Sequence, residues 1–354
     1  MGLIKNIKQI IKTAKINQRI NRAKIVHIMF NDKFNKPFVD FLNKNFNQKE
    51  HLVLCKRIFD QFPFPDGENV IEIKTLKNLN FDKVEKIICH SLFDNELVDY
   101  MFNHQNMLKQ KVYWVMWGGD LYGAPRDEKN DFVRKNFRGY IACIAGDEVI
   151  AKEKYGSDAK LYSAPYTVPI TSEMINNAMN NISSKDYIRV QINNSCDKSI
   201  LDAINLLSKY KDENVKISAT LSYGDIKYKE EIIQKGRELF GDKFEYVEKY
   251  LSPDNYAKYL ANTDIIFMYQ DRQQGLGNIT AASYMGKKIF IKSEISTFKY
   301  LSGLGIKIYD SHSVNDMEFK DFVDYPEEIK DNNIKICSKF YENDYLKKAW
   351  EEVF

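Results

Sequence analysis

Apolar and polar positions alternate in blocks along most of the chain. Short apolar runs with strand-like character occur at residues 24–30, 51–55, 69–73, 86–90, 112–117 and 140–144. A second series occurs at residues 187–192, 215–220, 244–249, 264–270, 287–293 and 305–309. Polar, helix-like stretches separate most of these runs. This alternation predicts an α/β fold in which parallel strands are joined by right-handed helical crossovers.

The two series are separated by a segment that contains Pro165 and Pro169, which interrupt regular structure. We therefore expect two Rossmann-like halves, at residues 25–165 and 172–335, and a C-terminal helix at 336–354 that could pack back on the first half. A chain of 354 residues is long enough to bury two cores. Ligands of such sheets bind at the carboxyl ends of the strands, so the residues directly after each strand are candidates for a site.

Residues 1–24 form a separate basic segment. Its apolar residues recur at helical spacing and its charged residues are all cations: Leu3, Ile4, Ile7, Ile10, Ile11 and Ala14, against Lys5, Lys8, Lys12, Lys15, Arg19, Arg22 and Lys24. Without these seven cations the chain keeps 45 basic and 49 acidic residues, although its net charge is +3. The pattern predicts a helix that lies on an anionic membrane surface. A helix that docks on the protein itself is the alternative, and nucleic acid is less favoured because no aromatic residue interleaves the cations.

The cysteine content and the apolar runs exclude several classes of protein. Five cysteines without a Cys-x-x-Cys pair argue against a disulfide framework or a structural zinc site. The histidines lack metal-ligand spacing, and His27, inside a strand, is expected to be a core residue. No apolar run reaches the roughly 18 to 20 residues that cross a bilayer, and no signal peptide is evident. These features indicate a protein of the reducing cytoplasm.

The turn after the run at 264–270 has the composition of an anion site. Gly275 and Gly277 allow close backbone approach, and a helix is expected to begin near Asn278. The free N–H groups at such a helix start favour a pyrophosphate, to which Gln273, Gln274 and Asn278 could donate further hydrogen bonds. Alternatively, the two glycines serve only the turn.

Two other turns carry polar residues after a strand. Asn193, Asn194 and Ser195 follow the run at 187–192, where they could cap the next helix or bind a ligand. Two polar loops on neighbouring strands would converge, so a nucleotide diphosphate could lie across this turn and the glycine turn.

In the first half, Asp120 follows Gly118 at the end of the run at 112–117. There it could act as a general base, bind sugar hydroxyls, or simply cap the turn. Asp32 and His90 occupy equivalent positions after other strands.

Two motifs together resemble a known family. Trp117-Gly118-x-Asp120-Leu121-Tyr122 and Arg272-Gln273-Gln274-Gly275-x-Gly277 are similar to motifs of the bacterial TDP-N-acetylfucosamine:lipid II N-acetylfucosaminyltransferases, glycosyltransferase family 56. The order of strands is similar from about residue 25 to the end, and Asn194-Ser195, His90 and Asp32 fall near similar residues of that family. The basic segment, Gly119 in place of an expected Ala, and Ser91 in place of an expected Gly depart from the pattern.

The resemblance implies a GT-B fold in which the second half holds a nucleotide-sugar donor, with a TDP-sugar favoured. It also implies a polyprenyl-pyrophosphate-linked acceptor, reached by the first half at the cytoplasmic face of the bacterial inner membrane. In this interpretation the donor residues are Asn194, Ser195, Tyr269, Arg272, Gln273, Gln274, Gly275, Gly277 and Asn278, and further substrate contacts come from Trp117, Gly118 and Tyr122.

The same interpretation assigns the chemistry of transfer. The helix start near Gly275, with Ser195 and Tyr269, would stabilise the departing nucleotide diphosphate without a metal or other cofactor, and no Asp-x-Asp motif is present. Asp120 is the first candidate for the base, with Asp32 or His90 as substitutes. A sugar-nucleotide epimerase of the same fold and a non-catalytic, membrane-associated nucleotide-sugar-binding protein are the alternatives.

Overall fold

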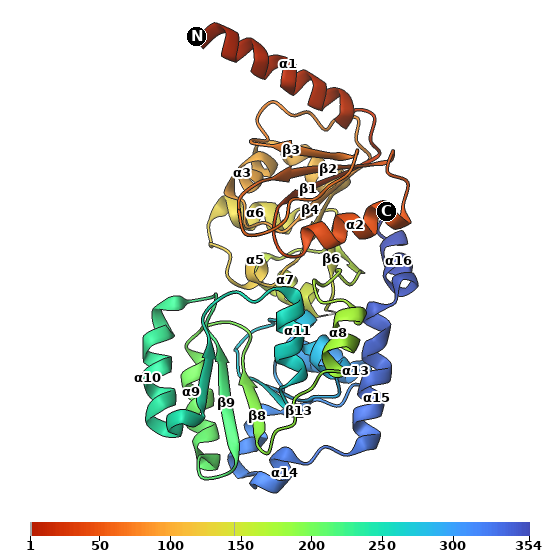
Figure 1. Ribbon diagram of the computed structural model, residues 1–354. Coiled ribbons are helices and arrows are strands. Elements are labelled where there is room, and N and C mark those ends of the chain that lie inside the picture. The colour runs from red at the N-terminus through yellow and green to blue at the C-terminus, as the bar shows by residue number, and fades with distance from the viewer. Residues whose placement is uncertain (1, 145) are drawn as a thin grey trace. The chain divides into compact units, whose positions relative to one another are not determined.

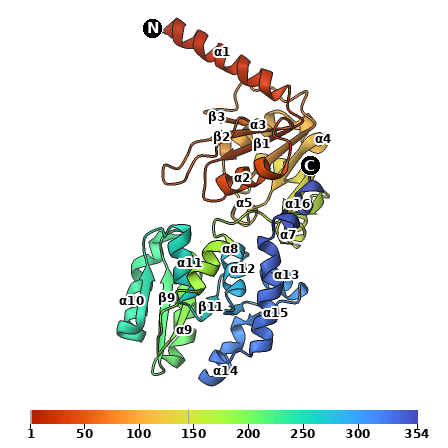
Figure 2. The same ribbon diagram turned by 45° about the vertical axis from the view of Figure 1, so that its right-hand side comes forward.

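The computed structural model describes residues 2–144 and 146–354 (Figures 1 and 2). The chain divides into two compact units. Unit 1 comprises residues 1–169 together with Leu346–Phe354, and unit 2 comprises Ile170–Tyr345. The chain therefore leaves unit 1 after Pro169 and returns to it for its last nine residues.

In the described chain, unit 1 contains a seven-stranded parallel sheet with the order β3-β2-β1-β4-β5-β6-β7. Its strands are β1 (Ile25–Phe30), β2 (His51–Lys56), β3 (Val70–Ile73), β4 (Lys86–His90), β5 (Val112–Val115), β6 (Gly139–Ala142) and β7 (Lys160–Ser163). Its helices are α1 (Gly2–Ile20), α2 (Asn35–Asn45), α3 (Asn95–Asn103), α4 (Leu108–Lys111), α5 (Gly119–Tyr122), α6 (Glu128–Lys135), α7 (Asp147–Tyr155) and most of α16 (Asn343–Glu351).

Unit 2 contains a six-stranded parallel sheet with the order β10-β9-β8-β11-β12-β13. Its strands are β8 (Ile188–Ile192), β9 (Val215–Thr220), β10 (Phe244–Val247), β11 (Ile265–Met268), β12 (Lys288–Ile291) and β13 (Tyr309–Asp310). Its helices are α8 (Ser172–Met179), α9 (Ser199–Leu207), α10 (Lys229–Phe240), α11 (Pro253–Ala261), α12 (Leu276–Tyr284), α13 (Ser296–Gly303), α14 (Phe319–Val323) and α15 (Glu327–Ser338).

Both sheets have a point at which the strand order reverses. In unit 1 this point lies between β1 and β4, and in unit 2 it lies between β8 and β11. The crossover connections run in opposite directions on the two sides of this reversal point, so the carboxyl ends of its strands (the strand exits) remain open to a ligand. Asp32 and His90 lie at the open point of unit 1, and the turns after Ile192 and Met268 meet at that of unit 2.

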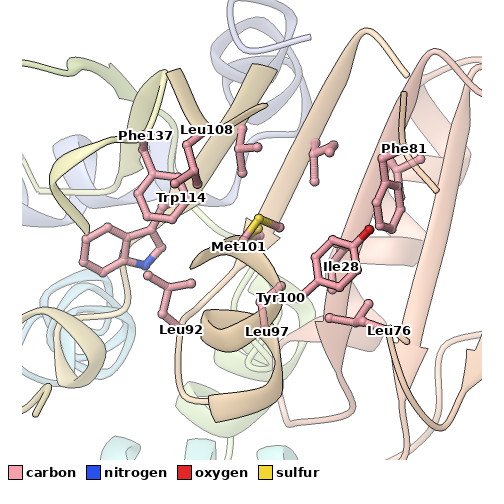
Figure 3. Close-up of a cluster of buried hydrophobic side chains, with 14 of the residues drawn as sticks. Ile28, Leu76, Phe81, Leu92, Leu97, Tyr100, Met101, Leu108, Trp114 and Phe137 are labelled. Carbon is pink, nitrogen blue, oxygen red and sulfur yellow. The ribbon is translucent and has the colours of Figure 1, made fainter. Parts of the chain in front are cut away.

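The core of unit 1 holds these strand exits in place. Trp114 of β5 is fully buried, and its ring lies 5.7 Å from the ring of Phe137 (Figure 3). Leu92 lies against the same indole in Figure 3. Close packing of this kind leaves little room for a strand to shift, so the turn that follows β5 is rigidly placed.

The last helix, α16, packs on unit 1 through Trp350. This side chain is fully buried, and its indole N–H donates a hydrogen bond to the Pro165 carbonyl at 2.9 Å. Lys86 Nζ bonds the Phe354 carbonyl at 3.2 Å. The final segment is thus part of the first core although it follows unit 2 in the sequence.

Helix α1 is attached to unit 1 by its last two turns. Ile16 and Ile20 are buried, and the Asn17 side chain bonds the Asn78 carbonyl and the Asn80 amide, each at 3.0 Å. These contacts set the direction of the helix, which extends away from the sheet of unit 1 in both views (Figures 1 and 2).

The earlier turns of α1 leave Ile7, Ile10 and Ile11 exposed, at 49%, 67% and 51% of their maximal area. The side chains of residues 2–6, which include the expected Leu3, Ile4 and Lys5, lie outside what the structure describes. Among the described helices, none has the length and apolarity that crossing a bilayer requires.

Eleven of the twelve predicted runs lie on strands, with ends that differ by up to two residues. The run at 305–309 becomes a strand only at Tyr309–Asp310, because the backbone of Lys307 bonds the Asn333 side chain, at 2.8 and 2.9 Å, instead of a neighbouring strand. Strand β7 was not predicted, since its Lys160 and Ser163 are exposed at the sheet edge.

Candidate functional site

In unit 2, Asn193 joins the two strand exits at the switch point. It has a positive φ of 47°, and its side-chain oxygen accepts a hydrogen bond from the Tyr269 amide at 2.7 Å. Its own amide donates to the Phe267 carbonyl at 3.0 Å. Asn tolerates this backbone conformation better than most residues, so a single side chain can fasten the turn after β8 to the turn after β11.

The neighbouring Asn194 is held by a buried polar network. Gln191 Nε2 donates to the Asn194 side-chain oxygen at 3.1 Å and to the Asn193 carbonyl at 3.0 Å. The Tyr256 hydroxyl also donates to the Asn194 oxygen, at 3.1 Å. Because its oxygen is occupied, Asn194 presents its amide nitrogen toward Gly275, with a weak contact to Met268 Sδ at 3.5 Å.

Gly275 lies close to Asn194 of the other turn. It has a φ of +71° and precedes the first residue of α12. A Cβ atom built there would lie 2.2 Å from Asn194 Nδ2, so any other residue would displace the asparagine. Glycine is thus needed both for its conformation and for the space that it leaves.

The remaining predicted residues of unit 2 surround this contact. Gln274 donates its side-chain amide to Ser195 Oγ, and Arg272 is exposed, bonding the Gln273 carbonyl at 3.2 Å. The ring of Tyr269 lies beneath Lys292 Nζ, 4.1 Å from its centroid. Gly277 and Asn278 lie in the first turn of α12, which begins at Leu276, slightly earlier than predicted.

This arrangement suits an anion. The first amides of α12 have no acceptor within the helix, and the helix dipole places partial positive charge at the same end. Arg272, exposed three residues before Gly275, adds full positive charge, whereas Lys292 is paired with Asp271 Oδ1 at 2.5 Å. The structure therefore brings the Asn193–Ser195 turn and the Gly275 turn together around a helix start that can hold a phosphate.

In unit 1, Asp120 is enclosed by its own surroundings. Only 1% of its area is exposed. One carboxylate oxygen accepts from the Trp114 indole at 2.7 Å and the Leu92 amide at 2.8 Å, and the other accepts from the Trp117 amide at 2.8 Å. Burial raises the pKa of Asp120, which the three hydrogen bonds oppose. The carboxylate ties the exits of β4 and β5 together, an arrangement that suits a positioning role better than proton transfer to a substrate.

Asp32 differs from Asp120 in its exposure and in its hydrogen bonds. It is partly exposed after β1, and its Oδ1 accepts from the amides of Phe34 and Asn35 at 2.7 and 2.9 Å, at the start of α2. Burial raises the pKa of Asp32 to about 6 despite these two bonds. A partly accessible carboxylate with a pKa near neutrality has the properties of a general base.

His90 lies in a buried chain of hydrogen bonds. Asn35 Nδ2 donates to the Phe30 carbonyl, so Asn35 Oδ1 accepts the Tyr166 hydroxyl, at 2.8 Å. That hydroxyl has no second proton, so His90 Nδ1 donates to it at 2.9 Å. His90 Nε2 therefore accepts from His27 Nδ1, also at 2.9 Å.

The chain ends at His51, whose Nδ1 donates to His27 Nε2 at 3.0 Å. Burial lowers the pKa of His90 to about 3 and that of His51 to about 4, and it lowers the pKa of His27 well below its usual value. All three rings are neutral near neutral pH. His90 thus supports Tyr166 and Asn35, and His27 is a core histidine, as predicted.

The other predicted residues of unit 1, Gly118, Trp117 and Tyr122, differ in burial and in their contacts. Gly118 has a φ of +74°, which explains the glycine. Trp117 is partly buried between the rings of Phe34 and Tyr166, at 4.7 and 4.8 Å. The Tyr122 hydroxyl donates to Asp147 at 3.0 Å, which directs it toward α7.

Neither unit shows a metal-like cluster in the described residues, since no three His, Cys, Asp or Glu side chains are grouped as ligands there. Four residues of these networks were not predicted from the sequence: Gln191, Tyr256, Asn35 and Tyr166. Of these, only Gln191 left a signal, as a polar residue inside an apolar strand. The partners of the other three are 62 to 131 residues away in the sequence, a distance at which spacing carries no information.

Solved structures establish the fold. The chain is similar to a sucrose-phosphate synthase from Thermosynechococcus elongatus (TM-score 0.67, 9% identity, 93% of this chain and 98% of that chain). It is also similar to a glycosyltransferase from Rickettsia africae (TM-score 0.65, 10% identity, 94% and 98%) and to Anabaena HepE in complex with UDP and glucose (TM-score 0.61, 12% identity, 92% and 98%). The predicted GT-B fold of two Rossmann-like domains is confirmed.

No curated protein matches the chain in sequence. A family model described as 4-alpha-L-fucosyltransferase, glycosyl transferase group 56, matches residues 24–351. The match runs from the residue before β1 to the end of α16 and leaves α1 outside. The chain therefore belongs to glycosyltransferase group 56, and it is a glycosyltransferase.

Proposed function

We propose that this glycosyltransferase moves an amino-deoxy sugar from a nucleotide diphosphate to a polyprenyl-pyrophosphate-linked saccharide, in the synthesis of a bacterial surface polysaccharide. Unit 2 binds the donor and unit 1 binds the acceptor. A TDP-sugar such as TDP-N-acetylfucosamine is the favoured donor, which the fucosyltransferase description of the family supports. The UDP and glucose in the complex of the Anabaena protein support a nucleotide-sugar donor more generally.

The proposal that unit 2 binds the donor rests on one observation. The turn after β8 and the turn after β11 touch at Asn194 and Gly275, where a Cβ would come within 2.2 Å of the asparagine. This contact places hydrogen-bond donors of both turns around the start of α12. A diphosphate across the two turns would engage Ser195, Gln274 and the helix amides together.

In the proposed reaction, the acceptor hydroxyl oxygen bonds to the anomeric carbon of the donor sugar. The bond from that carbon to the phosphate oxygen breaks, and its electron pair leaves with the nucleotide diphosphate. Asp32 takes the hydroxyl proton, for which its pKa of about 6 is suitable near neutral pH. The α12 amides stabilise the negative charge on the leaving group.

The acceptor would be reached at the membrane through α1. Its exposed Ile7, Ile10 and Ile11 can enter the lipid interface while its lysines face anionic headgroups. A shallow pocket between α1 and the segment after β3 places Lys74 and Lys77 beside Lys12, which extends the cationic surface onto the body of unit 1. We place the protein peripherally at the cytoplasmic face of the inner membrane.

The donor site can be tested by calorimetric titration with TDP, UDP, GDP and CDP. We expect one diphosphate to bind selectively, and Gly275→Ala to weaken that binding by at least about tenfold, since the added methyl group displaces Asn194. Gly303→Ala is the matched control in the same unit, because a Cβ there meets no atom within 4 Å.

Two results would contradict the proposal. The first is a folded wild-type protein that binds none of the four diphosphates. The second is equal loss of binding in both glycine variants, which would show a general effect of the added methyl group.

A further inference from the structure

Ser91, the residue directly after β4, has two energetically unfavourable features. Its φ is +81°, in the region that non-glycine residues avoid. The other described non-glycine residues with positive φ are Asn78 and Asn193, and Asn tolerates this conformation better than Ser. Holding Ser91 there is energetically unfavourable relative to a relaxed backbone.

The second cost is an unused hydroxyl. Ser91 is only 4% exposed, and its Oγ has no hydrogen-bond partner within the part of the chain that the structure describes. An unsatisfied buried polar group is energetically unfavourable. Glycine would avoid both costs, so their coincidence at one strand exit indicates that the hydroxyl serves a ligand.

A second unused donor lies on the next strand. The indole Nε1 of Trp117 is buried and has no acceptor among the described residues. Ser91 donates its amide to the Val115 carbonyl at 3.2 Å, and the amides of Leu92 and Trp117 both bond the Asp120 carboxylate. The Asp120 carboxylate thus links the backbone of Trp117 to that of Leu92, the residue after Ser91.

Ser91 and Trp117 lie at strand ends that suit binding of the acceptor in the proposed sugar transfer. The strand order places β4 between β1, which ends before Asp32, and β5, which ends before Trp117. Trp117 also lies against the rings of Phe34 and Tyr166. An indole N–H can only donate, a serine hydroxyl can donate or accept, and aromatic rings suit the C–H face of a sugar.

We propose that Ser91 Oγ and Trp117 Nε1 form an acceptor subsite that binds the oxygens of an acetamido sugar, an inference that rests on the proposed function. Trp117 Nε1 donates to the acetamido carbonyl or a ring hydroxyl, and Ser91 exchanges a hydrogen bond with a neighbouring hydroxyl. The backbone hydrogen bond from Ser91 to Val115 holds Ser91 at this strand end in the absence of ligand.

The test uses the full-length protein, with saturation-transfer NMR titration of N-acetylglucosamine and glucose as probes. We expect N-acetylglucosamine to bind the wild type more tightly than glucose does. Ser91→Ala removes the hydroxyl, and Ser91→Gly removes the hydroxyl and the strain. Both should weaken N-acetylglucosamine binding by roughly three- to tenfold, the loss of one neutral hydrogen bond, without lowering the melting temperature.

Asn78→Gly is the matched control, because it relieves a positive φ at an exposed position of the same unit and should leave sugar binding unchanged. The subsite is overturned by unchanged sugar binding in both Ser91 variants, by a lowered melting temperature in both, or by a wild type that does not bind the acetamido sugar. Titration of the wild type and of both Ser91 variants with TDP separates the two proposals, because a wild type that binds the acetamido sugar but not TDP counts against the donor site alone.

Discussion

Two carboxylates at strand exits of unit 1 have contrasting surroundings. Asp120 gives both oxygens to three N–H donors and is almost fully buried. Asp32 uses one oxygen for two amides and remains partly exposed. The same residue type can therefore hold two strands together in one place and remain available to a substrate in the other.

Asp120→Asn should destabilise the protein. Asn offers one oxygen acceptor in place of two and turns an N–H₂ group toward an N–H donor, so at least one buried bond is lost. We expect the free energy of unfolding to fall by about 2–4 kcal/mol, measured by urea denaturation. An unchanged denaturation midpoint would show that the carboxylate contributes little to the fold.

Asp32→Asn is the matched counterpart. The side-chain oxygen of the introduced asparagine can still accept from the amides of Phe34 and Asn35, so stability should change by less than about 1 kcal/mol. Turnover should fall by about 10²- to 10⁴-fold, since an amide cannot take a proton. The reactive form is the carboxylate, so wild-type kcat/KM should rise with pH through about 6. A variant that keeps wild-type turnover would remove Asp32 as the base.

At the scale of elements, the alternating pattern placed most of the strands and their carboxyl ends, but it missed β7. The meeting of the Asn193 and Gly275 turns followed from parallel strand exits, and the structure shows that meeting. The inward direction of Asp120 could not be predicted, because it depends on the Trp114 indole and on the Leu92 amide, 28 residues away. Such contacts follow from packing, and sequence spacing does not record them.

Helix α1, in contrast to Asp120, was predicted from the spacing of apolar residues within its own sequence. Its Ile16 and Ile20 dock on unit 1, while Ile7, Ile10 and Ile11 remain exposed. The docking alternative is confirmed for the end of the helix, whereas the membrane role of the exposed apolar stripe stays a prediction.

A triple variant that combines Ile7→Ser, Ile10→Ser and Ile11→Ser tests the function of this apolar stripe. We expect binding to vesicles that contain phosphatidylglycerol to weaken by at least about tenfold, because about 1 kcal/mol or more of apolar burial is lost per isoleucine. Sedimentation with vesicles at low and high salt measures the effect. Ile226→Ser is the control, since Ile226 is 66% exposed in unit 2, away from α1 in the sequence. Equal sedimentation of the triple variant and the wild type would rule out the membrane role of α1.

At the scale of the molecule, the two units differ in their buried titratable groups. The buried histidine chain of His27, His51 and His90 lies in unit 1. In unit 2 the sequence has only His312, which lies 3.2 Å from Glu294 with 43% of its side chain exposed. All three tryptophans, Trp114, Trp117 and Trp350, also belong to unit 1. Tryptophan fluorescence therefore reports on unit 1, and far-UV circular dichroism reports on both units.

Mild acid should destabilise unit 1 first. Burial lowers the pKa values of the three histidines, so between about pH 6.5 and about pH 4 the unfolded chain binds protons that the folded chain does not. Each histidine then lowers the stability by about 1 kcal/mol between about pH 7 and about pH 5.5. The raised pKa values of Asp32 and Asp120 act in the opposite direction but involve fewer groups.

The variant that isolates this effect is His51→Gln, whose side-chain amide can still donate to His27 Nε2 without titrating. In urea denaturation followed by tryptophan fluorescence, the loss of stability from about pH 7 to about pH 5.5 should shrink by about 1 kcal/mol relative to wild type. His312→Gln should leave that loss unchanged, because His312 belongs to unit 2. If both variants keep the full pH dependence of the wild type, the acid sensitivity of unit 1 arises from its carboxylates and the histidine chain has no part in it.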